Sequence, residues 1–505
     1  MTVHRIMGIE TEYGITVPGV RIMNAMATST RLVNAYARNN IRGRQRNPKW
    51  DYSEEAPLRD ARGFDMSRAE ADPSQLTDDD MGMANVILTN GARFYVDHAH
   101  PEYSSPEITG PRDAVLWDRA GAAIMHRAAQ YTTTDGVDLP ILLYKNNTDN
   151  KGASYGCHEN YLMNRSTDFS SIVAWMTPFF ISRQIFTGAG RLGIGQQTRD
   201  FQYQISQRAD FFETEVGLET TFKRPIINTR DEPHCDAERF RRLHVIVGDA
   251  NMSDTATYLK MGTTSLVLSM LESGFLEGMD MTATEPVRSM YAVSHDISLQ
   301  KRIPLTGGRN WTALEMQREF WNLASKFCES EYADSIDPET IDVLFQWGRI
   351  LDRLQEEPLE CADVLDWVAK YRLMEAYRSR GGLEWSAARL QAIDLQYADI
   401  RPDKGLALRL EERGQLVRMV TDQEIEHAQF HPPTDTRAYF RGECLRRFPD
   451  EIAAASWDSL IFDLPGKESL VRVPTMEPTK GTKALVGELL ASAANAAELV
   501  ELLGA

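Results

Sequence analysis

Cysteine is scarce in this sequence, and its few residues form no recognisable pattern. The chain of 505 residues contains five cysteines, an odd number, and no two of them are spaced as Cys-x-x-Cys. They are Cys157, Cys235, Cys328, Cys361 and Cys444. This usage argues against a disulfide framework and against a zinc site, and it favours a reducing compartment.

Long apolar runs and a secretion signal are also lacking. No apolar stretch has the length that a membrane-spanning helix requires, and the N-terminal residues do not have the pattern of a signal peptide. The formal charge of −18 makes nonspecific binding to nucleic acid unfavourable. We therefore expect a soluble cytoplasmic protein that binds neither membranes nor nucleic acid.

The common glycine-rich nucleotide-binding motifs are absent or out of context. Gly-x-x-x-x-Gly-Lys-[Ser/Thr] does not occur, which excludes a P-loop protein. Residues 188–193 match Gly-x-Gly-x-x-Gly, but the segment before them is helical by pattern and the segment 194–206 after them is extended. The dinucleotide motif requires a strand before the glycines and a helix after them. We therefore interpret these glycines as a loop.

What the sequence does contain is acidic side chains at alternating positions of predicted strands. Near the N-terminus, Glu10 and Glu12 fall on one face of a strand, because successive side chains point to opposite faces. Ile9 and Ile15 indicate partial burial, where two unpaired carboxylates would be costly. Mg²⁺ or Mn²⁺, which prefer oxygen ligands, would compensate their charge. Two surface glutamates on an edge strand are the alternative.

A second predicted strand places Arg93, Tyr95 and Asp97 on one face, while its other face is apolar. We expect a tight turn after this strand, lined by His98, His100, Glu102 and Glu107. A solvated polar face is the alternative interpretation. The mixture of a cation, a phenol, carboxylates and imidazoles exceeds what solvation requires, which favours a chemical role.

Two further predicted strands each place a histidine, His158 and His244, on a polar face. Carboxylate and imidazole side chains on neighbouring strands suit divalent metals that hold a polyphosphate. Arg93, Arg208 and Arg230 suit the negative oxygens of such a ligand, because a guanidinium binds phosphate through two parallel hydrogen bonds. The sequence therefore predicts a charged ligand at a polar sheet face.

Residues 39–80 form an unusual segment that is rich in charge. Its apolar residues are isolated: Trp50, Tyr52, Leu58 and Phe64. This composition is too poor in apolar side chains to fold alone, and loops of such length are usually functional or disordered. We predict a mobile loop insert that adjusts access to the site without supplying catalytic groups. Simple disorder is the alternative.

Strands and helices follow one another without regular β-α-β alternation. This order favours an α+β fold with a largely antiparallel sheet, and many of the helices are expected to pack on one face of it. The pair Pro432 and Pro433 marks a boundary. We predict a catalytic domain over residues 1–430, which contains the loop insert, and a small C-terminal domain over 431–505 that ends in a helix over 482–503.

Four segments of the sequence together carry a family resemblance. They are Arg5-Ile-Met-Gly-Ile-Glu-Thr-Glu-Tyr-Gly14, Asp97 to Tyr103 with its His-Pro-Glu, Tyr155-Gly-Cys-His-Glu-Asn-Tyr161, and Arg437-Ala-Tyr-Phe-Arg441. The combination resembles the family of Pup ligases and Pup deamidases/depupylases, and the similarity extends from Arg5 to beyond Pro478. That family is related in fold to glutamine synthetase, so the resemblance implies a glutamine-synthetase-like curved sheet packed by helices.

The family has two branches. The ligase uses ATP to join the C-terminal glutamate of Pup, a small disordered protein tag, to a substrate lysine. The other branch deamidates the C-terminal glutamine of Pup and removes Pup from tagged lysines. The insert at 39–80 and the short spacing from Asp97 to His100 resemble this second branch. The resemblance thus implies an ATP-dependent amidohydrolase that acts on Pup and pupylated proteins and is linked functionally to the bacterial proteasome. A ligase is the main alternative, and a silent adaptor is a third.

The resemblance also assigns roles to individual residues. It implies magnesium ligands at Glu10, Tyr95 and Glu102, with Glu12, His158 and His244 as further metal or phosphate candidates. It implies contacts to ATP, or to ADP plus phosphate, at Arg93, Ser105 and Trp457, with Arg208 and Arg230 as further contacts to phosphate or to the Pup carboxylate. The indole of Trp457 suits stacking on adenine, and core packing is the alternative for it.

Asp97 matches the catalytic aspartate of the family. A carboxylate beside Mg²⁺ is expected to have a lowered pKa and to stay ionised near neutrality. Such a group is a weak base, which favours direct attack of Asp97 on the amide carbonyl and a transient anhydride that water opens. Orientation of a water molecule is the alternative. Because amide hydrolysis needs no ATP energy, the nucleotide is expected to be a structural or electrostatic cofactor.

Overall fold

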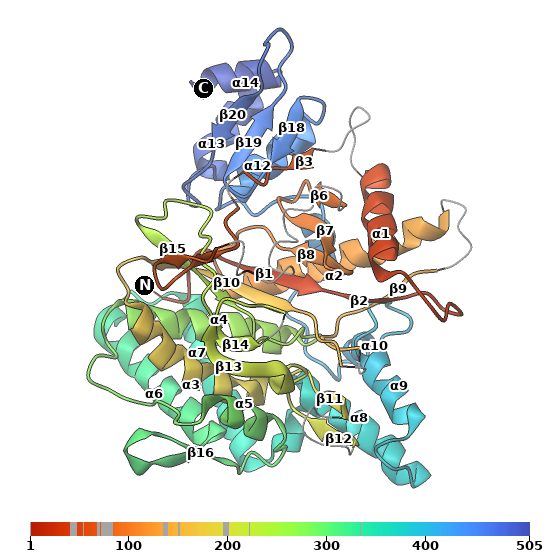
Figure 1. The fold of residues 1–505 in the computed structure, drawn as a ribbon, viewed down its shortest axis with the longest axis vertical. Helices are drawn as coiled ribbons and strands as arrows, with labels where there is room; N and C mark the ends of the chain where they lie inside the picture. The colour runs from red at the N-terminus through yellow and green to blue at the C-terminus, as the bar shows by residue number, and fades with distance from the viewer. Residues whose placement is uncertain are drawn as a thin grey trace.

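A six-stranded sheet with strand order β15-β10-β1-β8-β7-β6 forms the centre of the molecule, and each neighbouring pair in it is antiparallel (Figure 1). Its strands are β1 (Met7–Glu12), β6 (Asn85–Ile87), β7 (Arg93–Asp97), β8 (His100–Ser104), β10 (Cys157–Asn164) and β15 (Phe240–Val245). This computed structural model describes residues 2–40, 48–53, 55–67, 71, 84–134, 140–149, 152–194, 201–221, 223–333 and 335–504. The sheet confirms the predicted α+β class.

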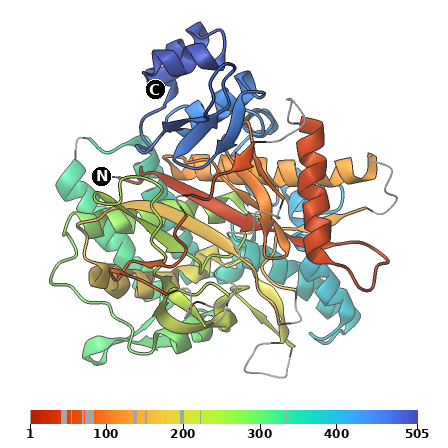
Figure 2. The same cartoon turned by 45° about the horizontal axis from the view of Figure 1, so that its top comes forward.

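Helices cover one face of this sheet. The longest are α2 (Pro111–Thr134), α3 (Phe169–Thr187), α4 (Asp254–Glu272), α6 (Ala313–Tyr332) and α7 (Pro338–Glu356). Tyr161 and Leu243 of the sheet are buried in one apolar cluster with Phe179 of α3 and Leu266 of α4. Figure 2 shows β1, in red, in the middle of the sheet, and the helices of residues 254–356, in green, lie on one side of it. The opposite face is left for polar side chains.

One buried ion pair joins the sheet to the helices beneath it. Both carboxylate oxygens of Glu159, on β10, accept hydrogen bonds from Arg183 of α3, at 2.6 and 2.9 Å. The hydroxyl of Tyr161 donates to Glu159 at 2.7 Å, and Arg183 also donates to Thr264 of α4 at 2.6 Å. Because side chains alternate along β10, this pair anchors the strand while His158 and Asn160 face the other side.

The remaining elements surround this centre. They are the helices α1 (Ala25–Asn40), α5 (Pro286–Ser294), α8 (Asp366–Gly381), α9 (Ala388–Tyr397), α10 (Leu406–Glu412) and α11 (Asp422–Ala428), and the two-stranded sheets β2 (Gly14–Thr16) with β9 (Leu142–Tyr144), β4 (Arg59–Asp60) with β5 (Phe64–Asp65), β11 (Arg191–Ile194) with β12 (Phe201–Gln204), β13 (Phe212–Gly217) with β14 (Arg224–Asn228), and β16 (Arg302–Pro304) with β17 (Asn310–Thr312). Among the described residues, no helix combines the length and apolar character needed to cross a bilayer.

The C-terminal part, blue in Figure 1, packs around its own apolar cluster, which includes Phe440 and Leu460. It consists of α12 (Ala438–Arg447), β18 (Ile452–Ala455), β19 (Ser459–Phe462), β20 (Val471–Pro474), α13 (Lys483–Ser492) and α14 (Ala496–Leu502). Its sheet has the order β20-β19-β18-β3, and β3 (Lys49–Trp50) comes from the predicted insert. The predicted domain boundary at residue 430 stays a prediction.

The predicted helix before the glycine-rich segment is confirmed as α3, but the predicted loop is confirmed only for Gly188 to Gly190, since Arg191 to Gly193 belong to β11. Two local predictions are wrong. The chain reverses tightly after Asp97, over His98 and Ala99, where His98 has a φ of 51°, but His100 and Glu102 lie on β8 and do not line the turn as predicted. The single helix predicted over 482–503 is two helices, since the side chain of Asn495 caps a new one by accepting from the Glu498 amide at 2.9 Å.

The predicted insert is described only in part. Its first residues, Asn39 and Asn40, belong to α1 and are helical rather than loop. Residues 48–53, 55–67 and 71 are described, and they include β3, β4 and β5. The rest of the range 39–80 lies outside the described residues, so the mobility of this segment stays a prediction.

We predict that Glu159→Gln lowers the free energy of unfolding by about 3–5 kcal/mol, because it leaves the buried guanidinium of Arg183 without a counter-charge. Urea denaturation followed by circular dichroism measures this change. The matched control is Glu285→Gln, whose partner Arg288 is exposed; its cost should stay below about 1 kcal/mol. Equal costs for the two variants would show that the buried pair does not anchor β10.

Candidate active site

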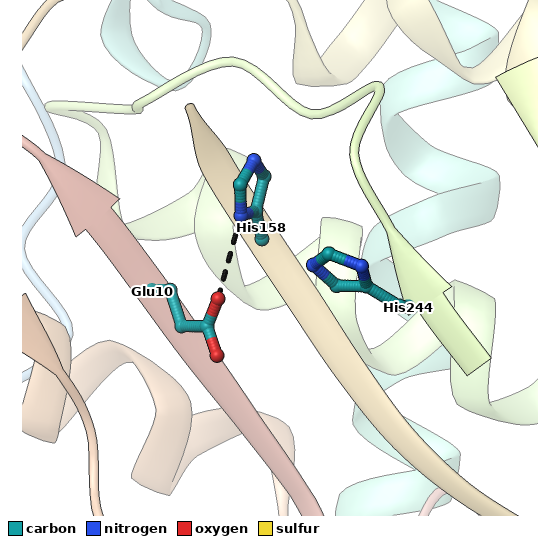
Figure 3. Close-up of side chains that lie close together, drawn as sticks. All are labelled: Glu10, His158 and His244. Atoms are coloured by element: carbon teal, nitrogen blue, oxygen red, sulfur yellow. Dashed lines mark hydrogen bonds and ion pairs between the residues drawn. The ribbon is translucent and has the colours of Figure 1, made fainter. Parts of the chain in front are cut away.

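Two groups of side chains able to bind a metal ion lie on the open face of the sheet. Glu10, His158 and His244 form the first group and come from the adjacent strands β1, β10 and β15 (Figure 3). The second group consists of Glu12, Asp97 and Glu102, from β1, β7 and β8. Within each group, the potential ligand atoms lie within 4.8 Å of one another.

The register of the strands brings these residues together. Glu10 lies opposite His158, and Glu12 lies opposite Glu102. Glu102 in turn lies opposite Tyr95 on β7. Because β1 pairs on both sides, its two glutamates reach one partner group each, and all of these side chains project from the same face.

The first group has compensated charges. Glu10 accepts a hydrogen bond from Asn160 at 3.0 Å and lies 3.4 Å from the ring nitrogen of His158. Burial alone would raise the pKa of Glu10, but the contact with His158 and the charge of Arg242 lower it to about 2. Burial and the charge of Arg242 hold the pKa of His244 well below its usual value. Glu10 is therefore ionised and His244 neutral at neutral pH, which is the state in which both bind a cation.

The second group has an excess of negative charge. Burial would raise the pKa of Glu12, but His100, at 3.2 Å, and the amide of Gly156, at 2.6 Å, lower it to about 2. Among the described residues, Glu102 has no comparable contact with a cationic side chain. Burial and the charges of Asp97, Glu10 and Glu12 therefore raise its pKa well above the usual value. Carboxylates crowded in this way fit a hard divalent cation, which supplies the missing positive charge.

A cleft borders both groups, and cationic side chains also line it. Arg93, Arg230 and Arg242 line it together with Tyr95, Glu102 and the side chains of the first group. An adjoining pocket is lined mainly by apolar residues, among them Ile6, Met7, Pro106, Leu162, Pro233 and Pro478. Trp457 lines both. The arrangement therefore offers a charged compartment beside an apolar one.

Most residues predicted from the sequence line this site. Glu10, Arg93, Tyr95, Asp97, Glu102, His158, Arg230, His244 and Trp457 line the charged cleft, and Glu12 belongs to the second carboxylate group. Ser105 lines the adjoining pocket, where its hydroxyl accepts from the Ile9 amide at 3.0 Å and donates to the Pro106 carbonyl at 3.0 Å. Its hydroxyl thus fixes the backbone between β1 and β8.

Arg208 lines neither the cleft nor the adjoining pocket, in contrast to the prediction. Its side chain is fully buried and donates to the carbonyl of Ile246 at 2.5 Å. Burial and the charge of Arg224 lower the pKa of Arg208 to about 10. Residue type favoured a phosphate contact, but the burial of this position was not visible in the sequence.

The structure adds residues that the sequence prediction did not include. Arg242 lines both compartments, donates to Asn160 at 3.2 Å and lies 3.3 Å from Glu232. Its position two residues before His244 on one strand was the available signal. Glu55 and His234 also line the cleft, and no pattern in the sequence marked either of them.

The Arg-x-x-x-Arg segment of α12 connects the C-terminal part to the site. Glu107, which follows β8, accepts from Arg437 at 2.7 Å and forms a second ion pair with Arg441. Burial would raise the pKa of Glu107, but these two guanidinium groups lower it to about 2. Arg441 also donates to the carbonyl of Trp457 at 3.0 Å, which fixes this residue beside the cleft.

Comparison with known proteins identifies relatives over almost the whole chain. The family described as Pup-ligase protein matches residues 5–461. A protein of Acidothermus cellulolyticus named depupylase is 59% identical, over 98% of this chain and 98% of its own. A protein of Mycolicibacterium smegmatis named Pup deamidase/depupylase is 54% identical, over 98% of this chain and 99% of its own.

A solved structure shows the same fold. The structure of the Pup ligase PafA in complex with ADP has a TM-score of 0.74 and is 32% identical, covering 85% of this chain and 95% of that one. The likeness supports the glutamine-synthetase-like fold expected from the resemblance. The matches in sequence and in structure agree, and the chain therefore belongs to the family of Pup-ligase proteins.

Proposed function

We propose that this chain is an ATP-dependent amidohydrolase acting on Pup. It deamidates the C-terminal glutamine of Pup to glutamate, and it hydrolyses the isopeptide bond between Pup and a substrate lysine. The observation that carries this proposal is the identity, over nearly the full length, of 59% to a protein named depupylase and of 54% to one named Pup deamidase/depupylase. The related ligase is only 32% identical.

Asp97 is the proposed catalytic residue. It lies at the end of β7, next to the hairpin, and its half-buried carboxylate lines the cleft beside Glu12 and Glu102. One of its oxygens lies 2.9 Å from the Nδ1 atom of His98, which fixes its orientation. A carboxylate held at the cleft surface in this way can reach an amide carbonyl that enters the cleft.

In the proposed reaction, a carboxylate oxygen of Asp97 attacks the carbonyl carbon of the side-chain amide of Pup. The carbon–nitrogen bond breaks, and the nitrogen leaves as ammonia, or as the amine of the substrate lysine, after taking a proton. Water then opens the resulting anhydride, which returns Asp97 to its carboxylate form and leaves a glutamate on Pup. Deprotonation of water by Asp97 would give the same products and is the alternative role.

The two compartments of the site suit a magnesium–nucleotide complex. Glu10, Tyr95 and Glu102 would hold the metal, with Glu12, His158 and His244 close enough to assist. Arg93 and Arg230 would bind phosphate oxygens, and Trp457 would stack on adenine in the adjoining apolar pocket, near Ser105. The bound metal supplies positive charge at the carbonyl oxygen. That the related ligase was solved with ADP supports the nucleotide part of this proposal.

A Pup ligase with the same site is the alternative. The two reactions are distinguished by two incubations with Mg-ATP. In the first, glutaminyl-Pup is supplied and ammonia is measured; in the second, Pup ending in glutamate is supplied with an acceptor protein, and conjugates and ADP are measured. The proposed hydrolase releases ammonia in amounts far above the consumption of ATP. A ligase instead forms conjugates and releases one ADP and one phosphate for each of them. Conjugation without ammonia release would overturn the proposal. The link to the bacterial proteasome and the cytoplasmic location remain part of the proposal.

We predict that Asp97→Asn keeps its nucleotide affinity and loses both deamidation and depupylation by at least about 10²-fold, since the amide can neither attack the carbonyl nor take a proton. Ammonia release and cleavage of a pupylated protein measure the loss, and calorimetric titration with ADP measures the affinity. Asp403→Asn, an exposed carboxylate far from the cleft lining, is the control. Activity of pure Asp97→Asn within threefold of the wild type would remove Asp97 from the chemistry.

We predict opposite effects of Glu102→Gln on stability and on binding. Without metal, replacing the crowded carboxyl group of Glu102 by a neutral amide should leave the melting temperature unchanged or raised. In Mg²⁺, the affinity for ADP should fall at least about tenfold, and chelation of the metal should abolish the difference between variant and wild type.

Differential scanning fluorimetry and titration calorimetry provide the two measurements for Glu102→Gln. Glu213→Gln, an exposed residue of β13, is the matched control and should change neither. Unchanged magnesium-dependent affinity in the Glu102 variant would show that this carboxylate does not hold the metal.

A further inference from the structure

The guanidinium group of Arg93 lies against two aromatic rings. Its central carbon is 3.9 Å from the ring centre of Tyr95 on the same strand and 4.0 Å from that of Trp50. Trp50 belongs to β3 in the insert, far from Arg93 in the sequence, and it is buried. The insert therefore supplies one side of a stack around a residue of the central sheet.

Other residues of the same short segment also contact Arg93 or its partner. Arg93 donates from Nε to the side chain of Asn85 at 3.1 Å, and Asn85 donates to the hydroxyl of Tyr52 at 3.0 Å. Glu55 accepts from the indole nitrogen of Trp50 at 2.6 Å and lies 3.8 Å from Arg93. Trp50 and Glu55 thus contact the guanidinium directly, and Tyr52 acts on it through Asn85.

The C-terminal sheet holds this segment in place. Lys49 and Trp50 pair with Ala454 and Ala455 of β18, and the amide of Asp51 donates to the carbonyl of Ala455 at 2.9 Å. Asp51 also forms an ion pair with Arg472 of β20 at 2.7 Å. The backbone that carries Trp50 is therefore fixed by groups that do not line the cleft.

We propose that Trp50, Tyr52 and Glu55 are positioning residues, which hold the guanidinium of Arg93 in the orientation that binds the nucleotide. This inference rests on the proposed contact between Arg93 and the phosphates. A free arginine side chain loses conformational entropy when it is fixed on a ligand. Contact with the two rings removes part of that cost before binding, and the N–H groups of the guanidinium recognise the anion.

A double-mutant cycle on ADP affinity tests this inference. Trp50→Leu and Arg93→Lys should each weaken ADP binding about five- to tenfold, and the double variant should bind no more weakly than Arg93→Lys alone. Trp50→Phe, which retains a ring face, should bind ADP within twofold of the wild type. Rescue by this conservative variant separates a role through the ring from a general loss of packing.

The control is Phe64→Leu, an exposed aromatic residue of the same insert that stacks on Arg62 and should leave ADP affinity unchanged. Additive effects of Trp50→Leu and Arg93→Lys would mean that Trp50 acts independently of Arg93, which overturns the positioning role. Unchanged affinity in Arg93→Lys would instead show that Arg93 is not a nucleotide contact. Binding of ADP is measured without Pup, so neither result depends on the proposed hydrolysis.

Discussion

The concentration of carboxylates on one face of a sheet is the constraint on which the rest of the structure depends. The negative charges of Glu10 and Glu12 are stabilised by histidines, an amide side chain and a backbone amide. Glu102 is instead surrounded by the like charges of Asp97, Glu10 and Glu12. A sheet can hold such repulsion only if its other face is firmly anchored. The buried pair of Glu159 and Arg183 provides that anchor on the strand that also carries His158.

The alternation of side chains along strands explains which parts of the site could be predicted from the sequence. Side chains alternate with a period of two, so the sequence placed Arg93, Tyr95 and Asp97 on one face, and Glu10 and Glu12 on another, before any pairing was known. The register that joins these faces depends on hydrogen bonds between distant strands and could only be expected from the family resemblance. The turn after Asp97 was predicted, but the strand β8 that follows it was not, because Pro101 resembles a turn residue although it lies on β8 and its carbonyl accepts from the Tyr13 amide.

Contacts between residues far apart in the sequence explain why the positions of some site residues could not be predicted from the sequence. Arg208 has a residue type that suits phosphate, yet the chain around it is fully buried. Trp50 and Glu55 sit in a segment whose composition predicts a loop, and their place beside Arg93 follows from pairing with a strand near the other end of the chain. Composition describes a segment in isolation, whereas this segment takes its structure from the surfaces on which it docks.

The pairing of β3 with β18 also has a consequence for the order in which the protein folds during its synthesis. A chain leaves the ribosome from its N-terminus, so Lys49 and Trp50 emerge long before their partners Ala454 and Ala455. Until then, the indole that covers Arg93 has no strand to dock on. The strands of the central sheet all lie before residue 246, but the segment that carries Trp50 pairs with β18, which is made about two hundred residues later. A nascent chain, or one truncated before β18, therefore carries an incomplete stack around Arg93.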